Sequence, residues 1–248
     1  MYRALSDIEL DSQSQEISPV YEPLKQTWPF FKENYKNFGS EHRCAERWCR
    51  LIRFGIRSLQ KRLPANDELI PQIAEFLGEY FGIFKQSAIL YLGSIVIDDF
   101  HGPHSVHMFN QMVGHALQIT KNSPISDIPE EIDDLFRLCT RLMQVDYKSF
   151  MTSPHASSLV NLAMECFSVQ HRDAHTSAMK FLIEIVMLAD EQRNGRMPGN
   201  ECVQVYEMFA KSMIDQSLDA LVHILPSSMV CDVADLYFAM KQYDIQVS

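Results

Sequence analysis

The sequence has 248 residues and a formal net charge of −10, with 46% hydrophobic and 22% charged residues. This composition is ordinary for a globular protein with a substantial core. The acidic balance argues against direct binding of nucleic acid or of anionic membranes, which usually requires a basic face. No apolar run approaches the roughly 20 residues of a membrane span, and the N-terminus lacks the apolar region of a signal peptide. We therefore expect a soluble intracellular chain with no membrane partner.

The beginning of the chain is polar and then becomes helical. Residues 1–18 show no periodicity and are expected to form a disordered leader. From Val20 onward, apolar residues recur at steps of three and four, which is typical of helices. We expect one continuous helical segment over 19–248. Ser40 follows a glycine and predicts the N-cap of the helix that comes next.

That next helix, predicted over 40–62, reads SEHRCAERWCRLIRFGIRSLQKR and has two unlike faces. At 100° per residue, its basic side chains fall within an arc of about 120°. They are Arg43, Arg47, Arg50, Arg53, Arg57 and Lys61. Seven basic and two acidic residues give this stretch a charge of +5, which leaves −15 for the rest of the chain. A positive strip on an acidic protein predicts a specific anionic partner.

The remaining helical segments are separated by proline-containing turns, and none shows the alternation of a β-strand. Ten helices group into five antiparallel pairs, whose first members begin near residues 20, 65, 103, 155 and 200. The starts are about 38 to 52 residues apart, near the period of roughly 40–47 that marks HEAT or armadillo units. We therefore predict an all-α fold, an α-solenoid of about five HEAT-type pairs. Neither end resembles a polar capping repeat, which indicates a piece of a longer array.

No pattern in the chain supports catalysis, a cofactor or a metal. His101, His104 and His107 have HxxHxxH spacing, but the Gly-Pro pair between the first two favours an ordinary inter-helix turn over a zinc site. The HRDA sequence at 171–174 begins like a kinase catalytic loop, yet Ala178 stands where a metal-binding asparagine is required. The six cysteines lack CxxC spacing and are expected to be reduced and buried. We expect no enzyme, no cofactor and no metal site.

Four blocks of sequence carry a resemblance to a known family. They are ERWCRLIRFGIR at 46–57, LYLGSIVID at 90–98, DDLFRLCTR at 133–141 and HRDAHTSAMKFL at 171–182. With these blocks in the same order across nearly all of 20–240, the chain resembles the transportin-SR (transportin-3 type) nuclear import receptors of the karyopherin, or importin-β, family. The importin-13 type is a weaker match.

The resemblance implies a HEAT-repeat receptor that shuttles between cytoplasm and nucleus and carries cargo under control of the GTPase Ran. In that family an arginine-rich helix binds the Arg/Ser-repeat domains of splicing factors, often phosphorylated. Arg47, Arg50, Arg53 and Arg57 stand where that helix would be, with Arg43 and Lys61 beside them. The resemblance covers a C-terminal portion only. The N-terminal repeats that grip Ran-GTP are outside it, so Ran-driven release by this chain alone is not expected.

The chemistry of the basic strip leaves two functions open. Guanidinium forks along one line can bind phosphate groups bidentately, which favours a phosphorylated peptide as the partner. The alternative is a non-enzymatic HEAT scaffold whose basic helix pairs with acids of another subunit or of its own helices, for example Glu75, Glu79, Asp98 or Asp99. RNA binding is disfavoured, because Phe54 is the one aromatic residue within the arc. Buried, paired guanidiniums would favour the scaffold, and an open row would favour the receptor.

Overall fold

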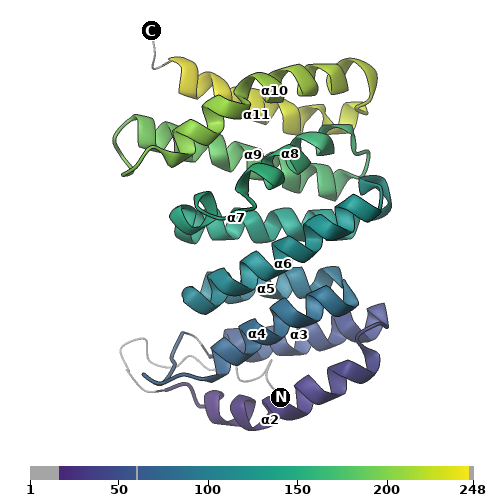
Figure 1. Ribbon diagram of the computed structural model, residues 1–248, viewed down its shortest axis with the longest axis vertical. Helices are drawn as coiled ribbons and strands as arrows, with labels where there is room; N and C mark the ends of the chain where they lie inside the picture. Colours follow the sequence, from purple (N-terminus) through teal and green to yellow (C-terminus); the bar gives the residue numbers. More distant parts are fainter. Residues whose placement is uncertain (1–16, 60, 246–248) are drawn as a thin grey trace. The chain divides into compact units, whose positions relative to one another are not determined.

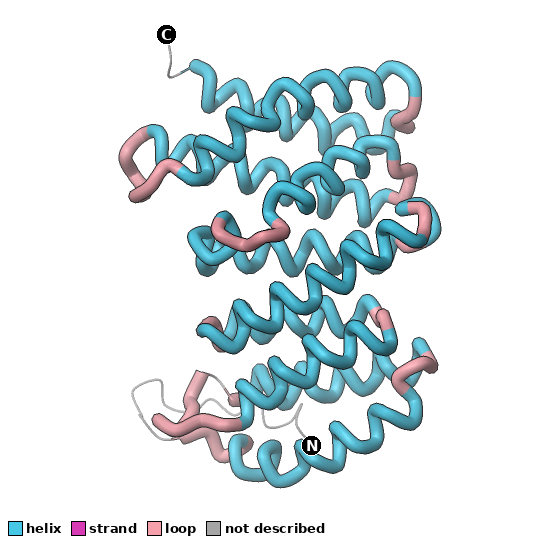
Figure 2. Tube along the Cα trace, in the orientation of Figure 1, coloured by secondary structure: helices cyan, strands magenta, loops and turns pink. Residues whose placement is uncertain are grey.

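The computed structural model describes residues 17–59 and 61–245, and within these ranges it contains ten α-helices, three short 3-10 helices and no strand. Figure 2 shows helices joined by short loops throughout the described chain. The predicted all-α class is therefore confirmed. The chain divides into two compact units, one ending at His115 and one beginning at Ala116.

The first unit contains two helical pairs and the start of a third (Figure 1). Its helices are α2 (Tyr21–Phe38), α3 (His42–Ser58), α4 (Leu69–Phe84), α5 (Ser87–Asp99) and the first part of α6 (Pro103–Asn122). In this unit α3 packs beside α5 and α2 packs beside α4, so the corresponding members of the two pairs form layers. This is the arrangement expected when consecutive helical pairs stack.

An aromatic cluster forms the core between these two pairs. Trp28 and Tyr35 lie one heptad apart on α2, and Phe76 and Tyr80 lie one turn apart on α4, so each pair shares one helix face. Trp48 of α3 lies between them, with ring centroids 4.6 Å from Tyr35 and 5.2 Å from Phe76. Aromatic pairs at such distances contribute about 0.5–1.5 kcal/mol beyond the area they bury. The cluster therefore holds the buried side of α3 in one orientation.

The second unit is organised around its central helix α9 (Arg172–Arg193). The other elements are the end of α6, η1 (Ile125–Asp127), α7 (Pro129–Met151), α8 (Ala156–Glu165), η2 (Cys166–Ser168), α10 (Glu201–His223), η3 (Ser227–Met229) and α11 (Val230–Ile245). Helix α9 packs against α7, α8, α10 and α11. Its Phe181 is fully buried, 5.2 Å from Phe136 and 5.6 Å from Phe150 between ring centroids. This unit too has a continuous apolar core.

The predicted pairing is confirmed, with corrections at individual boundaries. The first members of the five pairs begin at residues 21, 69, 103, 156 and 201. The basic helix is shorter than the predicted 40–62, because it begins at His42 and ends at Ser58. Its N-cap position is Glu41 rather than Ser40, and the Glu41 side chain makes no capping hydrogen bond.

The predicted leader lies mostly outside the described residues, which begin at 17. Ser18, its last residue, is buried and donates a hydrogen bond of 3.0 Å to the carbonyl of Ser58. Ser18 therefore packs against the end of α3. No helix in the described ranges is long and apolar enough to cross a membrane. All six cysteines are free, but Cys44 and Cys231 are exposed, so the prediction that all six thiols are buried is wrong for these two.

Candidate functional site

The packing of α3 against α2 fixes the rotation of α3 about its own axis, and this rotation determines which way its arginines point. Trp48 and Ile52 are buried, and the Trp48 indole N–H donates a hydrogen bond of 3.2 Å to the carbonyl of Phe31 on α2. At Gly55 an added Cβ would lie 3.1 Å from the Leu24 side chain, so α2 approaches the α3 backbone closely there. With this side fixed, the arginines lie on the opposite side of the helix.

We call Arg43, Arg47, Arg50, Arg53 and Arg57 the arginine face. Arg43, Arg47 and Arg57 are exposed and form no hydrogen bond or ion pair with any described residue. Arg50 pairs with Glu46 one turn earlier, at 2.8 Å, and the two side chains are 59% and 48% exposed. Exposed pairs at this spacing contribute about 0.3–0.5 kcal/mol. The face therefore remains largely available to a partner.

Arg53 is held more firmly than the other four arginines. It is half-buried, and its Nη1 donates a hydrogen bond of 3.2 Å to the Tyr91 hydroxyl on α5. Its guanidinium carbon lies 5.0 Å from the ring centre of Phe54 and 5.8 Å from that of Tyr91. Cation–π contacts at such distances contribute about 0.5–1 kcal/mol at exposed sites. Sequence reasoning missed Tyr91, which is separated from Arg53 by 38 positions and meets it only in the folded chain.

Lys61 is placed differently from its prediction. It lies beyond the end of α3 with φ 60°, in the left-handed region, so it is not a member of the helical row. Its Nζ donates a hydrogen bond of 3.4 Å to the carbonyl of Asp98. Arg57, Lys61, Asp98, Asp99 and Ile56 line a depression of about 430 Å³ at the end of the arginine face. The arginine face therefore ends beside Lys61 and the two carboxylates of Asp98 and Asp99.

The intrachain form of the scaffold alternative requires ion pairs between the arginine face and neighbouring acids. Glu75 and Glu79 are exposed, and neither forms an ion pair with the face. Among the described residues, Glu46 of the same helix is the one acid that pairs with an arginine of this face. The five guanidiniums thus form a mostly open row.

The histidines between α5 and α6 do not converge. Helix α6 begins at Pro103, so His101 precedes it while His104 and His107 lie on it, as the turn predicted. A ring nitrogen of His104 is bonded to the carbonyl of Phe100 at 2.9 Å. In the part of the chain that the structure describes, no group of three His, Cys, Asp or Glu side chains could hold a metal ion.

These features define a protein of stacked helical pairs that presents an open arginine row. Residues 18–123 match a family model described as the Transportin-3/Importin-13 fourth TPR domain. The curated relative Transportin MOS14 of Arabidopsis thaliana is 26% identical over 168 residues, 65% of this chain and 17% of the relative. A solved structure described as "Importin13 cytosolic state" is 17% identical with a TM-score of 0.81, over 98% of this chain and 27% of that chain.

Over residues 18–123 the chain is therefore similar to the transportin-3 and importin-13 type of the importin-β family. The solved structure supports the fold, a HEAT-like solenoid of helices. The family model covers the whole arginine face and Tyr91, and it ends before most of the second unit. The chain spans about a sixth of the length of the curated relative and about a quarter of the solved chain.

Proposed function

We propose that this chain is a cargo-binding part of a nuclear import receptor, and that its arginine face binds Arg/Ser-rich, phosphorylated segments of splicing factors. The observation that supports the proposal most directly is the open row on α3. Three of its five guanidiniums have no partner among the described residues, and Arg53 is positioned by Tyr91. The family match supports the transport role, and it suits a protein that shuttles between cytoplasm and nucleus.

The dimensions of the arginine face fit such a peptide. Arg47 and Arg57 are ten residues apart, which is about 15 Å along a helix, and successive arginines are about 4.5–6 Å apart. In an extended chain, phosphoserines at alternate positions lie about 6.6–7 Å apart. Long arginine side chains can adjust to this difference, and each fork can bind a phosphate through two hydrogen bonds. The row can therefore bind two or three successive phosphates.

The test is equilibrium binding of a fluorescent Arg-Ser repeat peptide, phosphorylated or unphosphorylated, to the whole chain. We expect tighter binding of the phosphorylated peptide, with an affinity that falls as salt is added, because most of the contacts are ionic. Hydrogen bonds to charged groups contribute about 1.5–3 kcal/mol. The double variant Arg50→Ala and Arg53→Ala should therefore bind the phosphopeptide about 10- to 100-fold more weakly.

A matched control removes two exposed cations elsewhere. Arg172 and Lys180 on α9 are exposed and have no partner among the described residues. Changing both to alanine should leave phosphopeptide affinity within about twofold, because neither residue belongs to the arginine face. Equal affinity of the wild type and the Arg50/Arg53 variant, with both chains folded by circular dichroism, would refute the assignment. In that case the scaffold alternative would gain support.

A further inference from the structure

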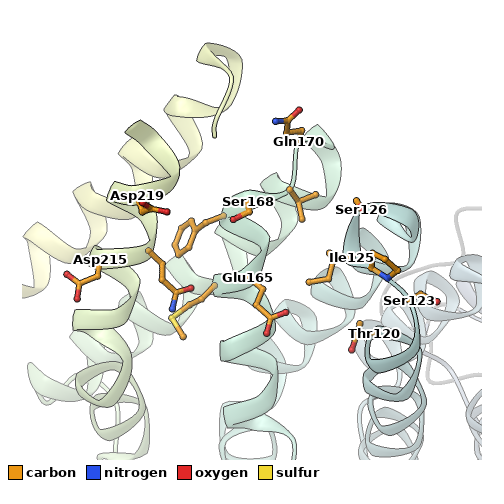
Figure 3. A pocket seen from close by; sticks show the side chains of 14 residues that line it. Thr120, Ser123, Ile125, Ser126, Glu165, Ser168, Gln170, Asp215 and Asp219 are labelled. Carbon is orange, nitrogen blue, oxygen red and sulfur yellow. The ribbon is translucent and has the colours of Figure 1, made fainter. Parts of the chain in front are cut away.

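The second unit contains an open groove that the proposed function does not use. It has a volume of about 970 Å³. One wall is the end of α6 with the turn after it, from Thr120 to Ser126, and another is the segment from Met164 to Gln170. The third wall is the stretch of α10 from Asp215 to Asp219 (Figure 3). The groove is large enough to bind several residues of an extended peptide, since ligand sites range over about 300–1,000 Å³.

The base of the groove is apolar and well fixed. Met164, Phe167 and Val169 line it, and each is less than a tenth exposed. The short 3-10 helix η2 follows α8 and contains Phe167. Its first residue, Cys166, is fully buried, and this fixes the position of the turn. These side chains belong to the core of the unit and expose little surface, whereas Ile125, which also lines the groove, is half-buried. An apolar group of a ligand would find contact area at Ile125.

The rim of the groove is acidic and is not neutralised by the chain itself. Glu165 and Asp215 are exposed and form no ion pair or hydrogen bond with any described residue. Asp219 pairs with His223 at 3.1 Å, and both of these side chains are about two-thirds exposed. None of the lining residues is basic. Residues 116–248 contain 18 acidic and 10 basic residues, so the surrounding unit adds to the negative potential.

These charges select the kind of ligand. Phosphate groups and nucleic acids would be repelled from the rim. Within the described chain the groove carboxylates are not grouped closely enough to hold a metal ion. A positively charged side chain with an apolar stem, or with an apolar neighbour, can pair with the carboxylates of the rim and also contact the apolar part of the groove. We propose that the groove binds an extended basic segment of a partner protein, with Arg or Lys at the carboxylates and an adjacent apolar side chain against Ile125.

This site would be distinct from the arginine face and opposite to it in charge. The test uses the whole chain and a short fluorescent peptide of Arg-Leu-Ser repeats. Glu165→Gln with Asp215→Asn removes the two unpaired charges, and we expect the affinity to fall about three- to tenfold, since exposed pairs contribute up to about 1 kcal/mol each. Replacing leucine by serine in the peptide should also weaken binding, because Ile125 would lose its apolar contact.

Two controls separate the groove from general attraction to an acidic protein. Glu75→Gln with Asp235→Asn removes the same charge from exposed positions that lie outside the groove lining, and it should change the affinity by less than about twofold. The Arg50→Ala and Arg53→Ala variant should bind the basic peptide at least as well as the wild type. Equal weakening by both acid-to-amide variants would overturn the proposal. So would equal binding of a Glu-Leu-Ser peptide, or no binding of the basic peptide at all.

Discussion

Tyr35 supports α3 from the centre of the aromatic cluster, and its hydroxyl group gives a sharp test of the packing. The side chain is fully buried, and the hydroxyl has no hydrogen-bond partner among the described residues. The change Tyr35→Phe keeps the ring contacts, including the one to Trp48 at 4.6 Å, and removes only this hydroxyl. A buried polar group without a partner costs about 1–3 kcal/mol. We therefore expect Tyr35→Phe to raise the free energy of unfolding by about 1–2 kcal/mol.

The same substitution should change how stability depends on pH. Burial raises the pKa of Tyr35 above its ordinary value. An unfolded tyrosine loses its proton near pH 10, whereas the folded protein keeps this proton to a higher pH. Above about pH 10 the unfolded state therefore binds fewer protons than the folded state, and the stability of the wild type falls. The phenylalanine variant lacks this contribution, so its advantage should grow as the pH rises through that range.

Urea denaturation followed by circular dichroism measures both effects. The control is Tyr243→Phe, because the Tyr243 hydroxyl donates a hydrogen bond of 3.1 Å to Glu207. Losing this bond should lower the free energy of unfolding by about 0.5–1.5 kcal/mol, a change opposite in sign to that at Tyr35. If Tyr35→Phe is destabilising by a similar amount, the Tyr35 hydroxyl is hydrogen-bonded in solution and the reasoning is refuted.

Two further predictions concern buried titratable groups. Burial lowers the pKa of His175, which lies 3.4 Å from Asp232. The folded protein therefore disfavours the protonated form of this histidine, and stability that is present above the pKa of the unfolded histidine is lost as the pH falls below that value. The urea midpoint should therefore fall between about pH 6.5 and pH 5, and it should fall less in His175→Gln. A thiol reagent should modify Cys44 and Cys231 in the native protein and the four buried thiols only after unfolding, since burial raises the pKa of Cys202, for example, to about 12. Rapid native modification of more than two thiols would contradict the burial pattern.

The helical pairs could be predicted from the sequence because the signals that define them are local. Three- and four-residue periodicity marks each helix, and prolines mark the turns. Pro129, for example, occupies the first position of α7. The end of α3 could not be predicted in this way, because nothing in the local sequence stops the helix at Ser58. There the chain instead turns, so that Ser18 can bond to the Ser58 carbonyl and Lys61 adopts a positive φ.

The parts of the candidate sites that sequence reasoning missed all depend on contacts between distant segments. Tyr91 reaches Arg53 because α3 and α5 run parallel, a register also marked by the contacts of His42 with Gln86 and of Lys61 with Asp98. The acidic groove likewise combines three segments that are far apart in the chain. Periodicity identifies which face of a helix is polar, but not which neighbouring helix lies beside it.

Repulsion between the arginines of the arginine face lowers the stability of α3, so the face does not serve the folding of this helix. Arg43 and Arg47, like Arg53 and Arg57, are like charges one turn apart, and two further pairs are three residues apart. Each such pair destabilises a helix by about 0.2–0.5 kcal/mol, so the row costs about 1–2 kcal/mol in total. Glu46 offsets only part of this, because its pair with Arg50 is exposed. The aromatic cluster on the buried side outweighs the repulsion, so α3 is stable without a counter-charge. An anionic partner would offset this repulsion, so an open row is the arrangement that the proposed binding role requires.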